Sequence, residues 1–231
     1  MPIRSMWKGL GHVTTTLGEF EPESHRVAEQ LRNDIIDGAR RPGDRLVERD
    51  IAAELGVSRI PVRDALRILV AEGLVTPRPR SWAIVREFSE SDVSDLYEVR
   101  AALEAITFRL AAERWDDEGL AGLRAVLDAG WAAGRAGDAV TARRYASEFH
   151  MVVTRLCGNV LLQEIGDSLG SRMRWLLTQH DDVLEVAREH EELYQAIAGR
   201  DLPELERLVS IHLSDSRRMA AERLRKGREL R

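Results

Sequence analysis

Two short helical patterns meet at a single glycine, and this junction restricts how the first third of the chain can fold. Glu48–Leu55 and Arg59–Glu72 each repeat apolar residues at helical spacing. Between them, Gly56 stands where the end of a helix favours a left-handed residue, and Ser58 stands where the next helix needs an N-cap. The spacing therefore predicts a helix-turn-helix.

A helix is predicted before this pair and a small hairpin after it. Helical periodicity begins near Ser24 and ends at Gly38. Two strand patterns, Leu74–Thr76 and Trp82–Val85, flank a proline-rich turn that carries two arginines. Together these elements predict a winged helix-turn-helix over residues 22–88.

The rest of the chain is predicted to be helical. Strand patterns stop after Glu87, and six helical patterns follow at residues 90–114, 117–135, 138–157, 160–178, 182–199 and 201–226. Connections this short make neighbouring helices antiparallel. We therefore expect a mostly α protein in which an antiparallel bundle occupies residues 89–231, with a variable arm at residues 1–21.

Composition indicates a globular cytoplasmic protein. The 231 residues are 44% hydrophobic and 32% charged, enough for two modest domains. The one cysteine, Cys157, excludes an intramolecular disulfide framework and a cysteine-based zinc ribbon, as expected in a reducing cytosol. No apolar run approaches the roughly 20 residues that span a bilayer, so no membrane association is expected.

Arginines on the second helix and the hairpin are the candidate DNA contacts. The net charge of the chain is −5, yet residues 25–88 contain 12 arginines and 10 acidic residues, a balance of +2. A winged helix-turn-helix inserts its second helix into the major groove. The candidates are Arg59 for guanine edges, Arg49, Ser58, Arg63 and Arg67 around the same helix, mainly for phosphates, and Arg78 and Arg80 on the wing. The alternative interpretation is a solvated, arginine-rich face.

The predicted winged helix-turn-helix region resembles the GntR family of bacterial regulators. The resemblance is carried by Arg41-Pro42-Gly43-Asp44-Arg45-Leu46, Glu48-Arg49-Asp50-Ile51-Ala52, Leu55-Gly56-Val57-Ser58-Arg59 and Pro61-Val62-Arg63-Asp64-Ala65-Leu66. It implies that Arg49, Arg59 and Arg63 occupy family DNA-contact positions. Near the tip of the wing, Ser81 replaces the usual glycine.

The second half resembles the FCD module of the FadR subfamily. The matching residues are Leu96-Tyr97-Glu98-Val99-Arg100, Phe149-His150, Gly158-Asn159, His190, Arg200-Asp201 and His212. Six helices resemble the shorter, VanR-like version. The resemblance implies an effector-binding and dimerisation domain, and hence a ligand-responsive dimer, expected to be a repressor, on a palindromic double-stranded operator.

Three histidines lie on apolar helix faces, which leaves two interpretations. His150, His190 and His212 could be three separate core histidines, or their imidazoles could converge on one divalent metal. The family resemblance implies the metal, because these residues match its three histidine positions. The aspartate of the family is replaced by Ala146, so a zinc or nickel ion would have three imidazole ligands and open positions.

Arg100 is the candidate effector-binding residue. It could form an i,i+4 salt bridge with Glu104 on a helix surface, or clamp the carboxylate of a small organic acid. The resemblance implies the clamp, and Arg172 or Arg174 is a weaker candidate for the same cavity. Two rivals stay open: a metal-dependent hydrolase, which lacks an HExxH run, and a sensor whose only effector is the metal.

Overall fold

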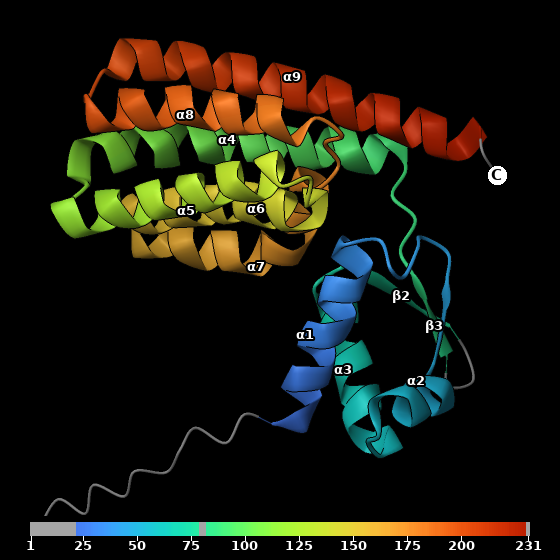
Figure 1. Ribbon diagram of the computed structural model, residues 1–231. Coiled ribbons are helices and arrows are strands. Elements are labelled where there is room, and N and C mark those ends of the chain that lie inside the picture. The colour runs from blue at the N-terminus through green and yellow to red at the C-terminus, as the bar shows by residue number, and fades with distance from the viewer. Residues whose placement is uncertain (1–21, 79–81, 230–231) are drawn as a thin grey trace, which may run out of the picture.

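The computed structural model describes residues 22–78 and 82–229 of the chain (Figure 1). In this part of the chain a small winged helix-turn-helix precedes a bundle of long helices, as the sequence predicts. The predicted arm at residues 1–21, and Arg80 and Ser81 at the wing tip, lie outside the described residues. Among the helices described, none is both long and apolar enough to cross a bilayer.

The winged helix-turn-helix at residues 22–88, called the winged half below, has its elements in the predicted order with one additional strand. Its elements are α1 (Glu23–Ile36), β1 (Arg45–Val47), α2 (Glu48–Leu55), α3 (Arg59–Ala71), β2 (Val75–Arg78) and β3 (Trp82–Val85). Strand β1 was not predicted, because three residues are too few to show an alternating pattern. It pairs antiparallel with β3, which lies in the middle of the sheet order β1-β3-β2. The pairing buries Leu46 completely.

The turn between α2 and α3 has the predicted backbone but not the predicted cap. Gly56 adopts a left-handed conformation with φ of 66°. The N–H of Val57 donates to the carbonyl of Ala52 over 3.0 Å, which closes the end of α2. Ser58 is the N-cap residue of α3 by position, yet its side chain makes no capping hydrogen bond and is exposed. The turn is therefore set by glycine.

Six helices form the bundle, and each boundary lies within three residues of its predicted position. They are α4 (Glu90–Arg114), α5 (Asp117–Arg135), α6 (Ala139–Leu156), α7 (Val160–Leu177), α8 (Val183–Ala198) and α9 (Leu202–Glu229). Side chains of Ser, Asp or Asn cap the starts of α4 to α8, which explains why each begins where it does. The helices lie side by side, with α7 on the side nearest α1 (Figure 1).

The hydrophobic core of the winged half continues into the bundle. Leu31 and Leu69 of the winged half belong to the same buried cluster as Leu96, on α4, and Trp175, on α7. At the junction, the ring of Phe88 stacks on that of Trp175 with centroids 3.9 Å apart. A second cluster around Phe108, Phe149 and Leu193 fills the centre of the bundle. The two halves thus share buried apolar surface.

Candidate nucleic-acid interface and candidate metal centre

The first two arginines of α3, Arg59 and Arg63, are held by one buried carboxylate. Glu48, the first residue of α2, accepts hydrogen bonds at 3.0 Å from Nε and Nη2 of Arg63. It also accepts one at 3.1 Å from Nη2 of Arg59. These hydrogen bonds, led by that from Arg63, lower the pKa of Glu48 below its usual range. Both guanidinium groups remain about half exposed, at 53% for Arg59 and 47% for Arg63, so they are positioned and still accessible.

The other predicted DNA contacts are exposed around this pair. Arg49 lies 2.9 Å from Asp50 and Arg67 lies 2.9 Å from Asp64, both in exposed ion pairs that contribute little to stability. Arg78 is exposed on β2. Its predicted neighbour on the wing, Arg80, is outside the described residues.

One exposed apolar residue on α3 was missed by the sequence analysis. Ile60 is 70% exposed and lies next to Arg59 in the first turn of the helix. The predicted contacts are arginines and one serine, so an isoleucine on the polar face is not among them. An aliphatic side chain at this place suits contact with a thymine methyl group in the major groove.

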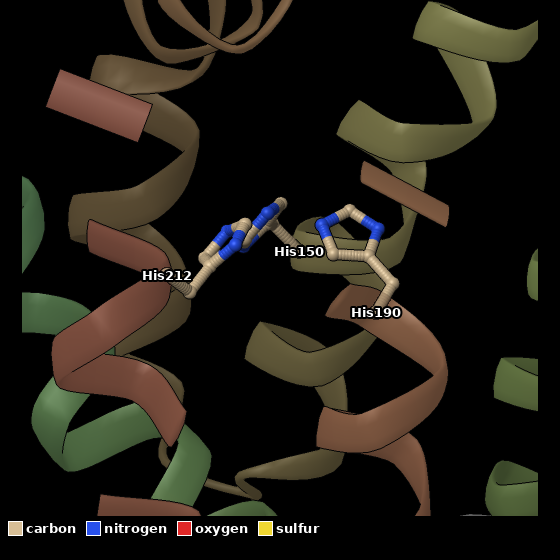
Figure 2. A group of neighbouring side chains, drawn as sticks. All are labelled: His150, His190 and His212. Carbon is tan, nitrogen blue, oxygen red and sulfur yellow. The ribbon is translucent and has the colours of Figure 1, made fainter. Parts of the chain in front are cut away.

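The three predicted histidines converge in the middle of the bundle (Figure 2). His150 comes from α6, His190 from α8 and His212 from α9, and all three are buried. One ring nitrogen of each can be chosen so that the three atoms lie within 4.8 Å of one another. Desolvation lowers the pKa of His190 and His212 well below 6.5. These two imidazoles are therefore neutral at pH 7, the form that binds metal.

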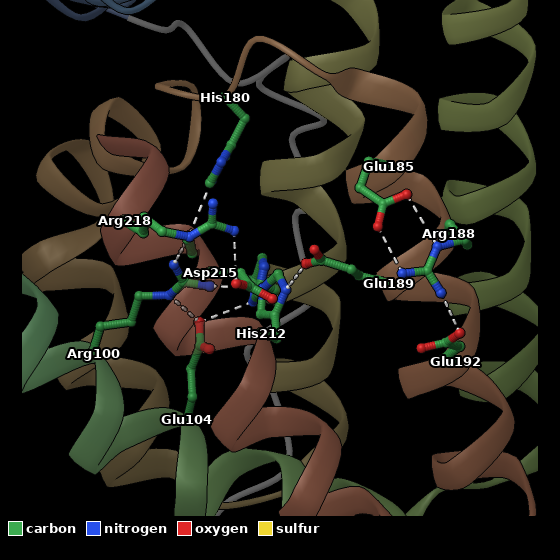
Figure 3. Close-up of polar contacts among 12 residues, drawn as sticks. Arg100, Glu104, His180, Glu185, Arg188, Glu189, Glu192, His212, Asp215 and Arg218 are labelled. Atoms are coloured by element: carbon green, nitrogen blue, oxygen red, sulfur yellow. Dashed lines mark hydrogen bonds and ion pairs between the residues drawn. The ribbon is translucent and has the colours of Figure 1, made fainter. Parts of the chain in front are cut away.

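His212 is fixed by partners on both ring nitrogens (Figure 3). Its Nε2 lies 2.9 Å from Nη2 of Arg100, and because a guanidinium only donates, this nitrogen accepts. Its Nδ1 therefore carries the proton and donates to Oε2 of Glu189 over 2.6 Å. Burial raises the pKa of Glu189 to about 7, whereas this hydrogen bond favours its ionised form. The pair has the arrangement in which a carboxylate orients a metal-binding histidine.

The three imidazoles offer nitrogen ligands for a divalent metal, and these nitrogens lie nearly close enough to bind one ion. Nε2 of His150 and Nε2 of His190 are buried and have no hydrogen-bond partner among the described residues, whereas Nδ1 of His150 lies 2.9 Å from Oε1 of Glu104. Nitrogens bound to one tetrahedral zinc ion at about 2.1 Å lie about 3.4 Å apart, so the rings have to close by about 1 Å to share one ion. Binding also requires Nη2 of Arg100 to leave Nε2 of His212.

Arg100 is not on a helix surface but at the centre of a buried polar network (Figure 3). The predicted salt bridge with Glu104 is present, at 2.8 Å between Nε and Oε1, yet Arg100 is only 2% exposed. Its Nη1 donates to Oγ of Ser216 over 2.7 Å. Desolvation opposes ionisation of Glu104, but Arg100, His150 and His212 together outweigh it and lower the pKa of this carboxyl strongly.

A fourth buried histidine, His180, joins this network from the loop between α7 and α8. In the structure it is 3% exposed, and its Nε2 lies 3.1 Å from Oγ of Ser216, the same hydroxyl that Arg100 contacts. Burial of a loop residue depends on how α9 crosses over it, which no local pattern shows.

A cavity of about 470 Å³ connects this network with the winged half. Its walls include Arg100, Glu104 and His150 inside the bundle, and Arg32 and Glu72 from the winged half. Its volume is within the range of small-molecule sites, about 300 to 1,000 Å³.

The α7 arginine that lines the cavity is Arg174 rather than Arg172. The side chain of Arg172 lies close to Gly73. Two positions along a helix correspond to about 200° of rotation, so the two residues face in nearly opposite directions.

Comparison with known protein families gives two matches along the chain. Residues 23–85 match the family described as bacterial regulatory proteins, gntR family. Residues 95–215 match the FCD domain. The first match covers α1 to β3, and the second covers most of the bundle, including the three histidines and Arg100.

Individual relatives extend over most of the chain. The probable D-xylose utilization operon transcriptional repressor of Paenarthrobacter nicotinovorans is 31% identical over 186 residues, which are 78% of this chain and 81% of that protein. The gluconate operon transcriptional repressor of Bacillus subtilis is 30% identical and covers 76% of each chain. A crystal structure of a GntR transcriptional regulator from Rhodococcus sp. RHA1 matches with a TM-score of 0.74 and 28% identity, covering 86% of this chain and 97% of that one. These proteins are regulators, not enzymes, so the hydrolase interpretation is set aside.

Proposed function

Because this chain belongs to the GntR family of transcriptional regulators and carries an FCD domain, we propose that it is a ligand-responsive repressor that binds a palindromic operator as a dimer. Residues 22–88 form the DNA-binding domain and residues 89–231 the effector-binding and dimerisation domain, with residues 1–21 as a variable arm. Two relatives named as operon repressors support the direction of regulation.

The observation that carries this proposal is the presentation of Arg59 and Arg63 by Glu48. A buried carboxylate that holds two half-exposed guanidinium groups on one helix reduces the entropy lost when they bind DNA. Arg59, at the start of α3, reaches guanine edges, while Arg63 contacts phosphates together with the remaining cations. Those further contacts are Arg49, Ser58, Arg67, Arg78 and Arg80.

The effector is a small organic acid in the cavity. Arg100 provides N–H donors for its carboxylate, once the guanidinium exchanges an internal partner for the ligand. His150, His190 and His212 would hold zinc or nickel, and that ion when bound supplies positive charge and open coordination positions near His150 in the cavity wall. The name of one relative, the gluconate operon repressor, makes sugar acids the first candidates.

The test begins with operator selection. Duplexes retained by the full chain from a random library should share a palindrome with half-sites about one helical turn apart, and a dimer should bind them. D-Gluconate and other small acids are then titrated against this duplex in zinc-loaded, nickel-loaded and chelator-treated protein. Release by an acid supports the proposal; release by metal alone supports the metal-only sensor. Absence of sequence preference would overturn the regulator assignment itself.

A further inference from the structure

The cavity has two chemically different ends. The inner end is formed by Arg100, Glu104 and His150, in the middle of the bundle. The outer end is formed by Arg32 and Glu72 of the winged half and Arg174 of α7. A ligand that fills the cavity would therefore contact the DNA-binding domain directly.

Arg174 is a cation at the outer end with unused binding capacity. Only one of its five N–H donors has a partner among the described residues, the Oδ1 atom of Asn33 at 3.1 Å from Nη2. No carboxylate in that part of the chain forms an ion pair with it. Burial, and secondarily the nearby charge of Arg32, lower the pKa of Arg174 from its usual value. The carboxylates of Asp37, Glu148 and Glu72 act on Arg174 only at longer range, so its guanidinium can still bind an anion in direct contact.

The carboxylate nearest to this end is already engaged. Glu72 accepts hydrogen bonds from Nε and Nη2 of Arg32 at 2.8 and 2.5 Å, and from Oγ of Ser171 at 2.7 Å. Glu72 is also the C-cap residue of α3, the helix proposed to enter the major groove. Whatever binds beside Glu72 thus acts on the end of that helix.

The surface of α7 leaves room beside Arg174. Gly170, one turn before it, lines the cavity, and a Cβ atom added there would meet no atom within 4 Å. A larger side chain at this position would occupy space inside the cavity without pushing neighbouring residues out of place.

We propose that the cavity takes an effector with two separated acidic groups, one bound near Arg100 and the other at Arg174. This inference rests on the proposed sensing function and specifies its ligand. The outer acidic group is the one that the DNA-binding domain detects. Its negative charge lies beside the carboxylate of Glu72, and the repulsion weakens the hydrogen bond from Ser171 to the end of α3. The diacid therefore releases the operator, whereas a monoacid occupies the inner end without doing so.

The binding test compares acids of equal length. Calorimetric titration of the full chain uses α,ω-dicarboxylates from succinate to suberate and the monocarboxylates with the same number of carbons. 3-Phosphoglycerate tests whether a phosphate serves as the second acidic group. The best diacid should bind about tenfold to a hundredfold more tightly than its monoacid, the contribution of one charge-assisted hydrogen bond. The variant Arg174→Gln should lose this difference, while Arg172→Gln, on the same helix and outside the cavity, should keep it.

The regulatory test uses the same acids on the protein–operator complex. The preferred diacid should lower operator affinity of the wild type but not of Arg174→Gln, and Gly170→Leu should abolish binding of every acid while retaining the operator. Equal affinity for monoacids and diacids, unchanged in Arg174→Gln, would overturn this inference and leave the sensing function intact. If no acid binds the wild type, both fail. The circular dichroism of each variant confirms that it is folded.

Discussion

At the scale of single residues, buried carboxylates decide how the functional side chains are presented. Glu48 holds the guanidinium groups of Arg59 and Arg63 on the face of α3. Glu189 fixes the tautomer of His212. Both carboxylates come from elements other than the residues they position, so the sequence around each arginine or histidine contains no sign of them.

Replacing Glu189 tests the metal centre without removing a ligand. The substitution Glu189→Gln keeps the size of the side chain but loses the ionised acceptor that orients His212. We expect zinc affinity to fall about tenfold to a hundredfold, the usual effect of losing such a partner. Competition with a chromophoric chelator measures it. Glu192→Gln, on the same helix and paired with Arg188 at the surface, is the matched control and should leave zinc affinity unchanged.

A zinc affinity of Glu189→Gln equal to that of the wild type would contradict the role of the Glu189 carboxylate in orienting a metal ligand. The variant His190→Ala then separates the remaining possibilities. If it too leaves zinc affinity unchanged, the three histidines are core residues and not a metal site.

At the scale of helices and strands, local chemistry determines most boundaries. Ser89, Asp116 and Asn159 each accept a hydrogen bond from the third residue of the helix that follows, and these caps are visible in the sequence. The periodicity of apolar residues places the helices between them. Strand β1 cannot be predicted from local sequence in this way, because it forms only by pairing with the distant strand β3.

The contacts in the candidate site could likewise not be predicted from local sequence. Apolar neighbours in each helix showed that His150, His190 and His212 point inward, but not that they meet. The burial of Arg100 and His180 depends on α9, more than a hundred residues after Arg100 in the chain. Sequence patterns report the face of a helix, whereas the identity of the neighbour on that face is set by tertiary structure.

Two glycine substitutions should change stability in opposite directions. Gly56→Ala places a Cβ in a left-handed conformation at the turn between α2 and α3, which costs about 1 to 2 kcal/mol of unfolding free energy. Gly122→Ala lies in the exposed interior of α5 with open space around it, and should add up to about 1 kcal/mol. Urea unfolding measures both. A stabilising Gly56→Ala would show that the turn tolerates another backbone conformation.

At the scale of the whole molecule, the stacked rings of Phe88 and Trp175 join the two halves into one buried cluster. Hydrogen bonds across the same junction connect Ser171 with Glu72 and Arg174 with Asn33. A DNA-binding domain attached in this way cannot move freely on its linker. Occupancy of the cavity beside the junction is therefore expected to reach α3 through direct contacts.

Phe88→Ala should uncouple the two halves. We expect a loss of about 3 to 5 kcal/mol, as for other buried aromatic residues, and a single calorimetric unfolding transition that separates into two. Phe108→Ala, in the second cluster, removes a ring of the same kind from the centre of the bundle and should not selectively release the winged half. Independent transitions already present in the wild type would contradict this coupling.

The most direct test of the account is the affinity for the selected operator duplex, measured by fluorescence anisotropy over a range of salt concentrations. The double variant Arg59→Ala, Arg63→Ala should lose about 2 to 6 kcal/mol of binding free energy, and its salt dependence should be shallower by about one to two ions. The control Arg109→Ala, Arg207→Ala removes two exposed, ion-paired arginines from the bundle and should bind like the wild type. A folded Arg59→Ala, Arg63→Ala variant with wild-type affinity and salt dependence would contradict the role assigned to α3.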